Sequence, residues 1–264
     1  MTQEHPTADM LRLAVALADE ARAFVRPRFR RKIEVADKAD GTPVTEVDKE
    51  LEVLLRGRIR AAFPEHGIVG EEAGTQRGDA DWVWVIDPID GTQSFILGKP
   101  TFATLIGLMH RGSPVLGVAE HPALAERWIG MAGSPTTQNG ETVRVRTCSD
   151  IAHAALSTTG PNWFAADELA AFDRVRRIAK LQHWGADCLS FGLLASGFID
   201  LVIESSHGLH DFCALVPIVE GAGGLMTDWT GRRLEAKSGP RVIAAGDRRV
   251  HAETLALLGT SRAW

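Results

Sequence analysis

The sequence has few of the features that mark several common protein classes. Its three cysteines, Cys148, Cys188 and Cys213, are widely spaced and form no CxxC pair. Neither a disulfide framework nor a structural zinc site is therefore expected, and reduced, buried thiols are the simpler interpretation. Charged residues interrupt the apolar N-terminal stretch, and no apolar run is long enough to cross a bilayer. We expect a cytoplasmic protein with no signal peptide and no membrane partner.

A basic surplus is also missing. The 34 acidic residues outnumber the 29 lysines and arginines and give a net charge of −5, which argues against nonspecific binding of nucleic acid. The histidines form no HExxH pair, and the chain has neither a GxSxG elbow nor a P-loop. The metal ligands that remain are oxygen donors, the set that magnesium prefers.

The length of 264 residues fits one large domain or two closely packed lobes. Apolar residues at helical spacing predict helices over 9–26 and 46–62, with a polar loop at 36–43 between them. Short apolar runs predict strands at 82–87, 102–109, 115–119, 128–131 and 142–146. Beyond residue 165 the pattern alternates. It predicts helices at 165–178, 187–196, 212–222 and 248–258, and strands at 201–204, 225–228 and 241–245.

The most informative segment is residues 82–92, WVWVIDPIDGT. An apolar strand ends in Asp87, and Asp90 follows three residues later. Because Pro88 cannot continue a sheet ladder, we expect the chain to leave the strand there. Two carboxylates so close repel each other unless a cation lies between them. The backbone of Gly91 and Thr92 can then approach an anion closely. A plain turn is the alternative, since DG is a common turn former.

Four other acidic elements have both structural and functional interpretations. The pair after Gly70, which begins with Glu71, is a weak signal that gains force from its place upstream of the two aspartates. Asp48 completes a capping box with Thr45, and its position in a first helical turn also suits a metal cluster. Asp211 could simply cap a helix that begins near residue 212, and the strand 201–204 ends in Glu204.

The motifs together resemble one family. GEE at 70–72, WVIDPIDGT at 84–92 and HDFCALVPIVEGAGG at 210–224 are similar, in order and spacing, to those of the inositol monophosphatase family. The resemblance covers nearly the whole chain. Phrases at 39–48, 63–72, 90–108, 184–188 and 214–220 are most similar to the histidinol-phosphate phosphatase branch.

The resemblance implies an α/β fold, a layered α-β-α-β-α sandwich of the inositol monophosphatase/fructose-1,6-bisphosphatase type that forms a homodimer. One phosphatase domain would span 1–264. Its first lobe, about 1–147, would carry DPIDGT, and its second, 148–264, the substrate side and the last metal-binding aspartate. Two or three Mg²⁺ ions would lie between the lobes. The implied ligands are Glu71, Asp87 and the carbonyl of Ile89 for one ion, and Asp87, Asp90 and Asp211 for the next.

The resemblance also implies roles for other positions. Gly91 and Thr92 would bind phosphate through backbone N–H groups, and Thr92, oriented by Asp48, would align or deprotonate the attacking water. Asp48, Glu71 and Thr92 would thus be catalytic. Glu204 and Asp187 would face the organic part of the substrate.

We therefore expect magnesium-dependent hydrolysis of a small phosphorylated metabolite, first of all histidinol phosphate to histidinol in histidine biosynthesis. Inositol 1-phosphate, or another sugar or nucleotide phosphate, is the nearest alternative. A non-catalytic metal- or ligand-binding protein is an alternative of a different class, and the net charge disfavours an RNA-associated regulator. Two departures from the family pattern stand out. His210 replaces a common tryptophan, which bears on local packing, and Gln93 replaces a frequent basic residue, which bears on the substrate.

Overall fold

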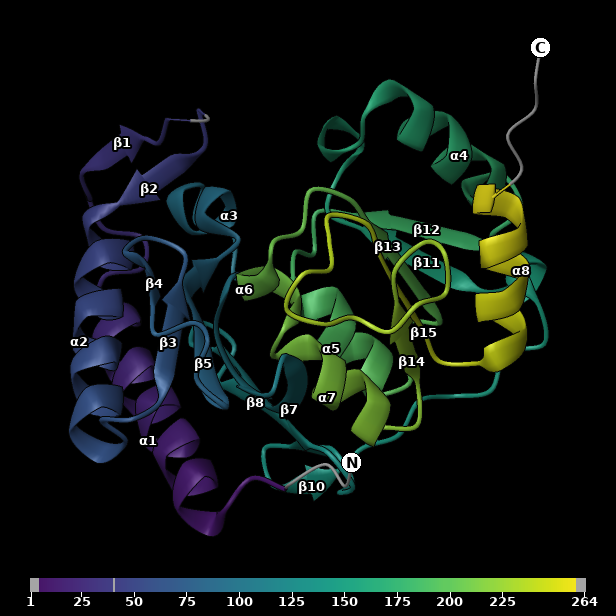
Figure 1. Ribbon diagram of the computed structural model, residues 1–264. Helices are drawn as coiled ribbons and strands as arrows, with labels where there is room; N and C mark the ends of the chain where they lie inside the picture. The colour runs from purple at the N-terminus through teal and green to yellow at the C-terminus, as the bar shows by residue number, and fades with distance from the viewer. Residues whose placement is uncertain (1–4, 40, 260–264) are drawn as a thin grey trace.

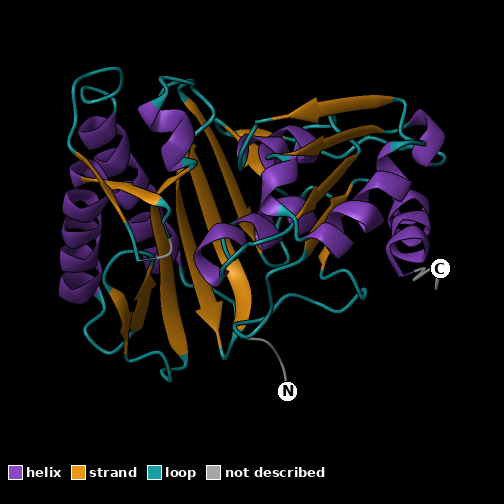
Figure 2. Cartoon of the chain, turned by 90° about the horizontal axis from the view of Figure 1, so that it is seen from above, coloured by secondary structure: helices purple, strands orange, loops and turns teal. Residues whose placement is uncertain are grey.

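The computed structural model describes residues 5–39 and 41–259, and its elements lie in α-β-α-β-α layers (Figures 1 and 2). The helices are α1 (Ala8–Val25), α2 (Glu46–Ala62), α3 (Thr92–Ile96), α4 (Ala166–Arg176), α5 (Leu189–Ala195), α6 (Leu209–Phe212), α7 (Leu215–Gly221) and α8 (Arg248–Gly259). None of these helices combines the length and the apolar character that a bilayer span requires. The predicted layered fold is confirmed.

The two main sheets differ in topology. The first has eight strands in the order β10-β9-β8-β7-β6-β5-β3-β4, in which only the β3–β5 pair is parallel. Its strands are β3 (Gly67–Gly70), β4 (Gly74–Gln76), β5 (Trp82–Asp90), β6 (Ala103–His110), β7 (Ser113–His121), β8 (Glu126–Met131), β9 (Thr137–Gln138) and β10 (Glu141–Thr142).

The second sheet has five strands in the order β12-β11-β13-β15-β14. Its strands are β11 (Ala155–Thr158), β12 (Leu181–Trp184), β13 (Leu201–Glu204), β14 (Leu225–Thr227) and β15 (Val242–Ala245). Strand β11 pairs in parallel with both neighbours, whereas β15 is antiparallel to both of its own. Helices α4 and α8 pack on the outer side of this second sheet.

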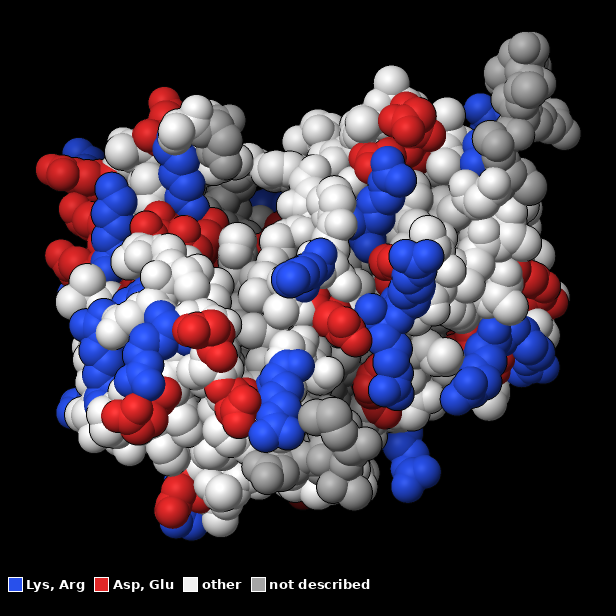
Figure 3. Space-filling model, viewed as in Figure 1, with Lys and Arg blue, Asp and Glu red and all other residues white. Residues whose placement is uncertain are grey.

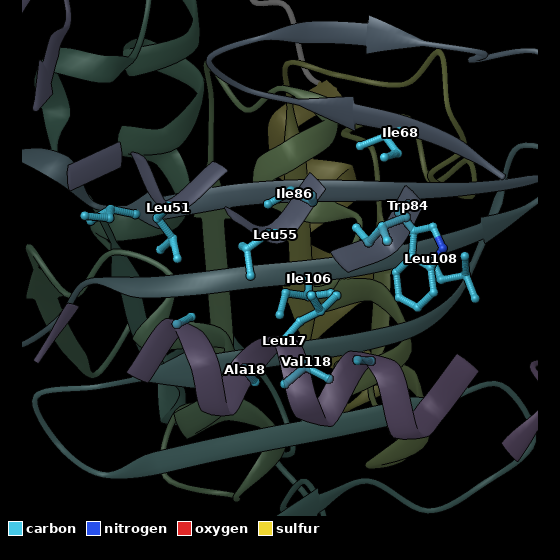
Figure 4. Close-up of a cluster of buried hydrophobic side chains, with 14 of the residues drawn as sticks. Leu17, Ala18, Leu51, Leu55, Ile68, Trp84, Ile86, Ile106, Leu108 and Val118 are labelled. Carbon is cyan, nitrogen blue, oxygen red and sulfur yellow. The ribbon is translucent and has the colours of Figure 1, made fainter. Parts of the chain in front are cut away.

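Helices α1 and α2 form the outer layer because each has one apolar face. Leu17 of α1 and Leu51 and Leu55 of α2 are fully buried against the first sheet, where they meet Trp84 and Ile106 (Figure 4). Burying such side chains contributes about 1.5–3 kcal/mol each. Helix α2 begins and ends where the sequence predicts.

The middle layer, α5 and α7, contacts both sheets, and glycines bring it close to the first one. A Cβ on Gly117 of β7 would lie 1.8 Å from the carbonyl oxygen of Ala214, and one on Gly130 of β8 would lie 2.3 Å from that of Pro217. Only glycine permits this approach of helix backbone to strand backbone. The layer contact in turn fixes where α6, just before α7, faces β5.

Several predicted elements need correction. The predicted loop at 36–43 contains parts of a hairpin, β1 (Val35–Asp37) with β2 (Pro43–Thr45), although residue 40 lies outside the described residues. The predicted strand 142–146 is wrong beyond its first residue. There the amides of Val143 and Val145 bond the carbonyls of Thr136 and Ala222 as the chain crosses to the second sheet. Strands β11 and β12 were not predicted. For β12 the reason is that it is an exposed edge strand without an apolar pattern.

The predicted helix 212–222 is two helices, α6 and α7, and it begins earlier than expected. Pro217 explains the break, because it lacks the N–H that would bond the carbonyl of Cys213. Helix α7 restarts at Leu215, which places Pro217 within its first turn, where no intrahelical N–H bond is needed.

Candidate active site

Strand β5 carries the aspartate pair, and it does so by a route that the sequence did not predict. The strand continues to Asp90 through an irregularity between Asp87 and Asp90 in its pairing with β6, so Pro88 does not end it. The carbonyl of Pro88 instead accepts a hydrogen bond from Thr104 Oγ1 at 2.7 Å. Proline is tolerated at such a bulge, and the bulge redirects both carboxylates.

The acidic residues from distant segments converge. Carboxylate oxygens of Asp87, Asp90 and Asp211 all lie within 4.8 Å of one another. Glu71, which follows β3, lies equally close to Asp87. These side chains line a cavity of about 520 Å³. In Figure 3, acidic atoms gather beside a hollow between the parts of the molecule that contain α2 and α4.

Asp211 reaches this cavity from within α6 rather than from an N-cap position. Its Oδ2 accepts a hydrogen bond from the amide of Gly208 at 2.5 Å, and Gly208 is the residue that caps the helix. The simple capping interpretation of Asp211 is therefore wrong in detail. Its second oxygen is not used by this hydrogen bond and remains available to bind a cation together with Asp87 and Asp90.

The electrostatics indicate a missing positive charge. Burial, followed by repulsion from Glu71, Asp90 and Asp211, raises the pKa of Asp87 well above its ordinary value. Burial and the charge of Asp211 raise the pKa of Asp90 to about 7. Within the described chain, the buried Oδ1 of Asp87 has no hydrogen-bond partner. A divalent cation coordinated by oxygen would satisfy this atom and remove the repulsion, so the residues fit such an ion.

Asp48 caps α2, as the sequence predicted, and it also contacts Thr92. Its Oδ2 accepts a hydrogen bond from the amide of Thr45 at 2.8 Å and completes the capping box of α2. Its Oδ1 lies 3.4 Å from the hydroxyl of Thr92, which donates to the carbonyl of Ile89 at 2.9 Å. Burial raises the pKa of Asp48. The Thr92 hydroxyl thus lies between a carboxylate and the carbonyl that was expected to bind metal.

Gly91 makes the turn from β5 into α3 with a φ of +77°, a conformation that favours glycine. The amide N–H groups at a helix start have no partner within the helix, so those of Gly91 and Thr92 are suited to bind phosphate. A Cβ on Gly91 would lie 3.1 Å from Cγ of Asp187. Because it is so close to Gly91, Asp187 lies next to the expected phosphate position. Asp187 also accepts a hydrogen bond from the hydroxyl of Thr101.

Glu204 lies at the end of β13 and lines the same cavity, although it is almost completely buried. It accepts hydrogen bonds from the amide and hydroxyl of Thr159 at 2.7 and 3.0 Å and from the hydroxyl of Thr158 at 3.2 Å. Burial outweighs these bonds and raises the pKa of Glu204 to about 8. A cationic group beside this carboxylate would therefore favour its ionised form.

Sequence reasoning missed Lys38. Its ammonium lies 2.5 Å from Glu71 and 2.6 Å from Glu72. Burial lowers the pKa of Lys38, but hydrogen bonds to both glutamates outweigh that effect and raise it. A lysine in a polar loop gives no local signal of such a contact. Cys188 was also missed, and its amide donates to Asp90 at 3.2 Å.

Comparison with known proteins identifies the family and agrees with the fold. The profile of the inositol monophosphatase family matches residues 7–262. The bifunctional phosphatase IMPL2 of Arabidopsis thaliana, a chloroplastic protein, is 47% identical over 91% of this chain and 72% of its own. A histidinol-phosphatase of Chlorobaculum parvum is 36% identical over 84% of this chain and 87% of its own. An inositol monophosphatase structure from Zymomonas mobilis superposes with a TM-score of 0.89 at 43% identity and covers 97% of this chain and 100% of its own. The chain belongs to the inositol monophosphatase family.

Proposed function

We propose that this member of a phosphatase family hydrolyses L-histidinol phosphate to L-histidinol with the help of two or three Mg²⁺ ions. The observation that carries the proposal is the convergence of Asp211 with Asp87 and Asp90, which creates a site that needs cations. Resemblance to a histidinol-phosphatase supports the substrate. Inositol 1-phosphate is the second candidate, because a similar solved structure is described as an inositol monophosphatase.

In this proposal Glu71, Asp87 and the carbonyl of Ile89 hold one ion, and Asp87, Asp90 and Asp211 hold the next. Ions held there would lower the pKa of a bound water and neutralise charge on the phosphate and the leaving oxygen. The residues of the chain supply position, which is most of what phosphoryl transfer requires.

Thr92 and Asp48 orient the attacking water. The threonine hydroxyl can donate its one proton either to the carbonyl of Ile89 at 2.9 Å or to Oδ1 of Asp48 at 3.4 Å. With the Ile89 carbonyl engaged by an ion, the hydroxyl would donate to Asp48 and offer its lone pairs to a water proton. Glu71 lines the same cavity and serves both as ligand and as acceptor for a water proton. The amides of Gly91 and Thr92 hold the phosphate oxygens.

Asp187 and Glu204 recognise the organic group. Histidinol carries an imidazole and an amine, and a carboxylate accepts charge-assisted hydrogen bonds from both. Glu204→Gln keeps the shape of the side chain but removes its charge. We expect it to raise KM for histidinol phosphate more than KM for inositol 1-phosphate, whose hydroxyls are neutral. Equal changes in the two KM values would contradict the role of Glu204.

The direct test is phosphate release from L-histidinol phosphate and inositol 1-phosphate, measured side by side with Mg²⁺ and with EDTA. Faster, Mg²⁺-dependent release from histidinol phosphate is expected. Preference for inositol 1-phosphate would replace the substrate but retain the chemistry. Absence of single-turnover hydrolysis with a wide panel of phosphate esters would instead favour a non-catalytic protein.

We propose a single domain with lobes at about 1–147 and 148–264, assembled as a homodimer, as the family resemblance implies. Light scattering coupled to gel filtration measures the assembly directly. An RNA-associated role has little support, because the net charge is −5 and the face shown in Figure 3 mixes both signs of charge.

A further inference from the structure

His210 lies inside the acidic site. One of its ring nitrogens lies within 4.8 Å of carboxylate oxygens of both Glu71 and Asp87, which are themselves that close to each other. The histidine precedes Asp211 in α6 and reaches a different pair of carboxylates from the pair that Asp211 joins. Its side chain is 28% exposed.

Neighbouring residues position the imidazole ring, but Asp211 does not form a hydrogen bond with it. A Cβ on Gly208 would lie 2.8 Å from Cε1 and 3.3 Å from each ring nitrogen, so the imidazole packs closely over this glycine. Its Nε2 lies 3.6 Å from Oδ1 of Asp211, beyond hydrogen-bond distance. A ring nitrogen lies within 4.8 Å of a carboxylate oxygen of Asp87. Asp87 is only 1% exposed, and its buried Oδ1 lacks a hydrogen-bond partner among the described residues.

We propose that His210 supplies an imidazole nitrogen to the ion that Glu71 and Asp87 hold. This step rests on the proposed role of those two carboxylates as ligands. Magnesium prefers oxygen ligands and binds nitrogen poorly, whereas imidazole raises affinity for divalent transition metals. The nitrogen ligand therefore raises the affinity of the position next to Glu71 for Mn²⁺ and Co²⁺ relative to Mg²⁺, which still binds there through the oxygen ligands. The all-oxygen position of Asp87, Asp90 and Asp211 suits Mg²⁺.

Mn²⁺ is a direct probe because it is paramagnetic. Its binding to the metal-free protein is measured by electron paramagnetic resonance, and a directly bound imidazole is detected as nitrogen modulation of its electron spin echo. We expect a Mn²⁺ ion bound next to Glu71 to show strong nitrogen modulation, which changes when histidine is labelled with ¹⁵N. In His210→Phe the modulation disappears, and Kd for Mn²⁺ rises by about tenfold or more, since even outer-shell changes cost metal sites 10–100-fold.

Matched variants separate the alternatives. His207 also lines the cavity, so His207→Phe should keep the nitrogen signal. Gly208→Ala keeps the imidazole but displaces the ring, and it should weaken the signal. If His210→Phe does not fold, His210→Asn replaces it as the variant that removes the imidazole. In either His210 variant, Kd for Mg²⁺, measured by calorimetry, should change far less than Kd for Mn²⁺.

The outcomes distinguish this inference from the proposed function. Tight Mn²⁺ binding without nitrogen modulation, or with modulation that persists in His210→Phe, would overturn the role of His210 and leave the carboxylate site intact. Failure of Mn²⁺ and Mg²⁺ to bind at all would overturn the metal site itself.

Discussion

At the scale of single residues, Asp90 separates metal chemistry from folding. Its carboxylate belongs to the triad with Asp87 and Asp211, and its pKa is raised by burial and by the charge of Asp211. Asp90→Asn removes a ligand charge, and we expect kcat/KM for phosphate release to fall about 10³-fold, the equivalent of several kcal/mol of electrostatic stabilisation. Circular dichroism should show an intact fold. A nearly normal rate would exclude Asp90 as a ligand.

Asp48 requires a substitution that leaves its capping bond in place. Asp48→Asn retains an acceptor for the amide of Thr45, so the free energy of unfolding should change by no more than about 1 kcal/mol. The charge that orients the hydroxyl of Thr92 is lost, and kcat should fall about 10²-fold, at the lower end for acid–base assistance. If kcat stays unchanged while Asp48→Ala unfolds the protein, Asp48 is purely a cap.

At the scale of elements, the glycines under α7 hold the middle layer against the first sheet. Gly117→Ala would force Cβ into the carbonyl of Ala214, so the free energy of unfolding should fall by about 3 kcal/mol or more, beyond ordinary overpacking. Activity should fall as well, because the shift moves α6 and Asp211. Gly57→Ala is the matched control. Gly57 lies exposed within α2 with nothing near its missing Cβ, and alanine there should stabilise the protein by about 0.5–1 kcal/mol. Urea unfolding of both variants measures the contrast.

Elements with a local cause were predictable, and those with a distant cause were not. The helix 46–62 has its cap, its apolar face and its end within its own sequence, and the structure agrees residue for residue. The strand at 82–87 was predicted but not its continuation past Pro88, because that depends on pairing with β6 and on Thr104. Strand β12 exists only because β11 offers it a partner.

The site shows the same division. The acidic motifs and their order were readable, since DPIDGT places two carboxylates at one strand end. That Asp211 lies with them depends on the glycines beneath α7, which bring α6 toward β5 across the layers. The contact of Lys38 with Glu71 depends on a hairpin that the sequence suggested was a loop.

At the scale of the whole molecule, the acidic site links stability to pH and to metal. The pKa of Asp90 is about 7 in the metal-free fold, against an ordinary value of 3.8, so between these limits the folded state holds a proton that the unfolded chain releases. With respect to this group the metal-free protein should therefore be most stable below about pH 4. It should lose a contribution on the order of 4 kcal/mol as the pH rises from 4 through 7.

Bound Mg²⁺ should reverse that trend, because it favours the ionised carboxylates, while protons compete with it in acid. Differential scanning calorimetry in EDTA and in Mg²⁺, from pH 5 to 8, should show an Mg²⁺-induced rise in Tm that grows with pH. Activity should fall toward pH 5 for the same reason. In Asp90→Asn the metal-free Tm should decline less steeply with pH. If its profile instead matches that of the unmodified protein, the repulsion lies elsewhere and Asp90 is not the group that couples folding to the metal.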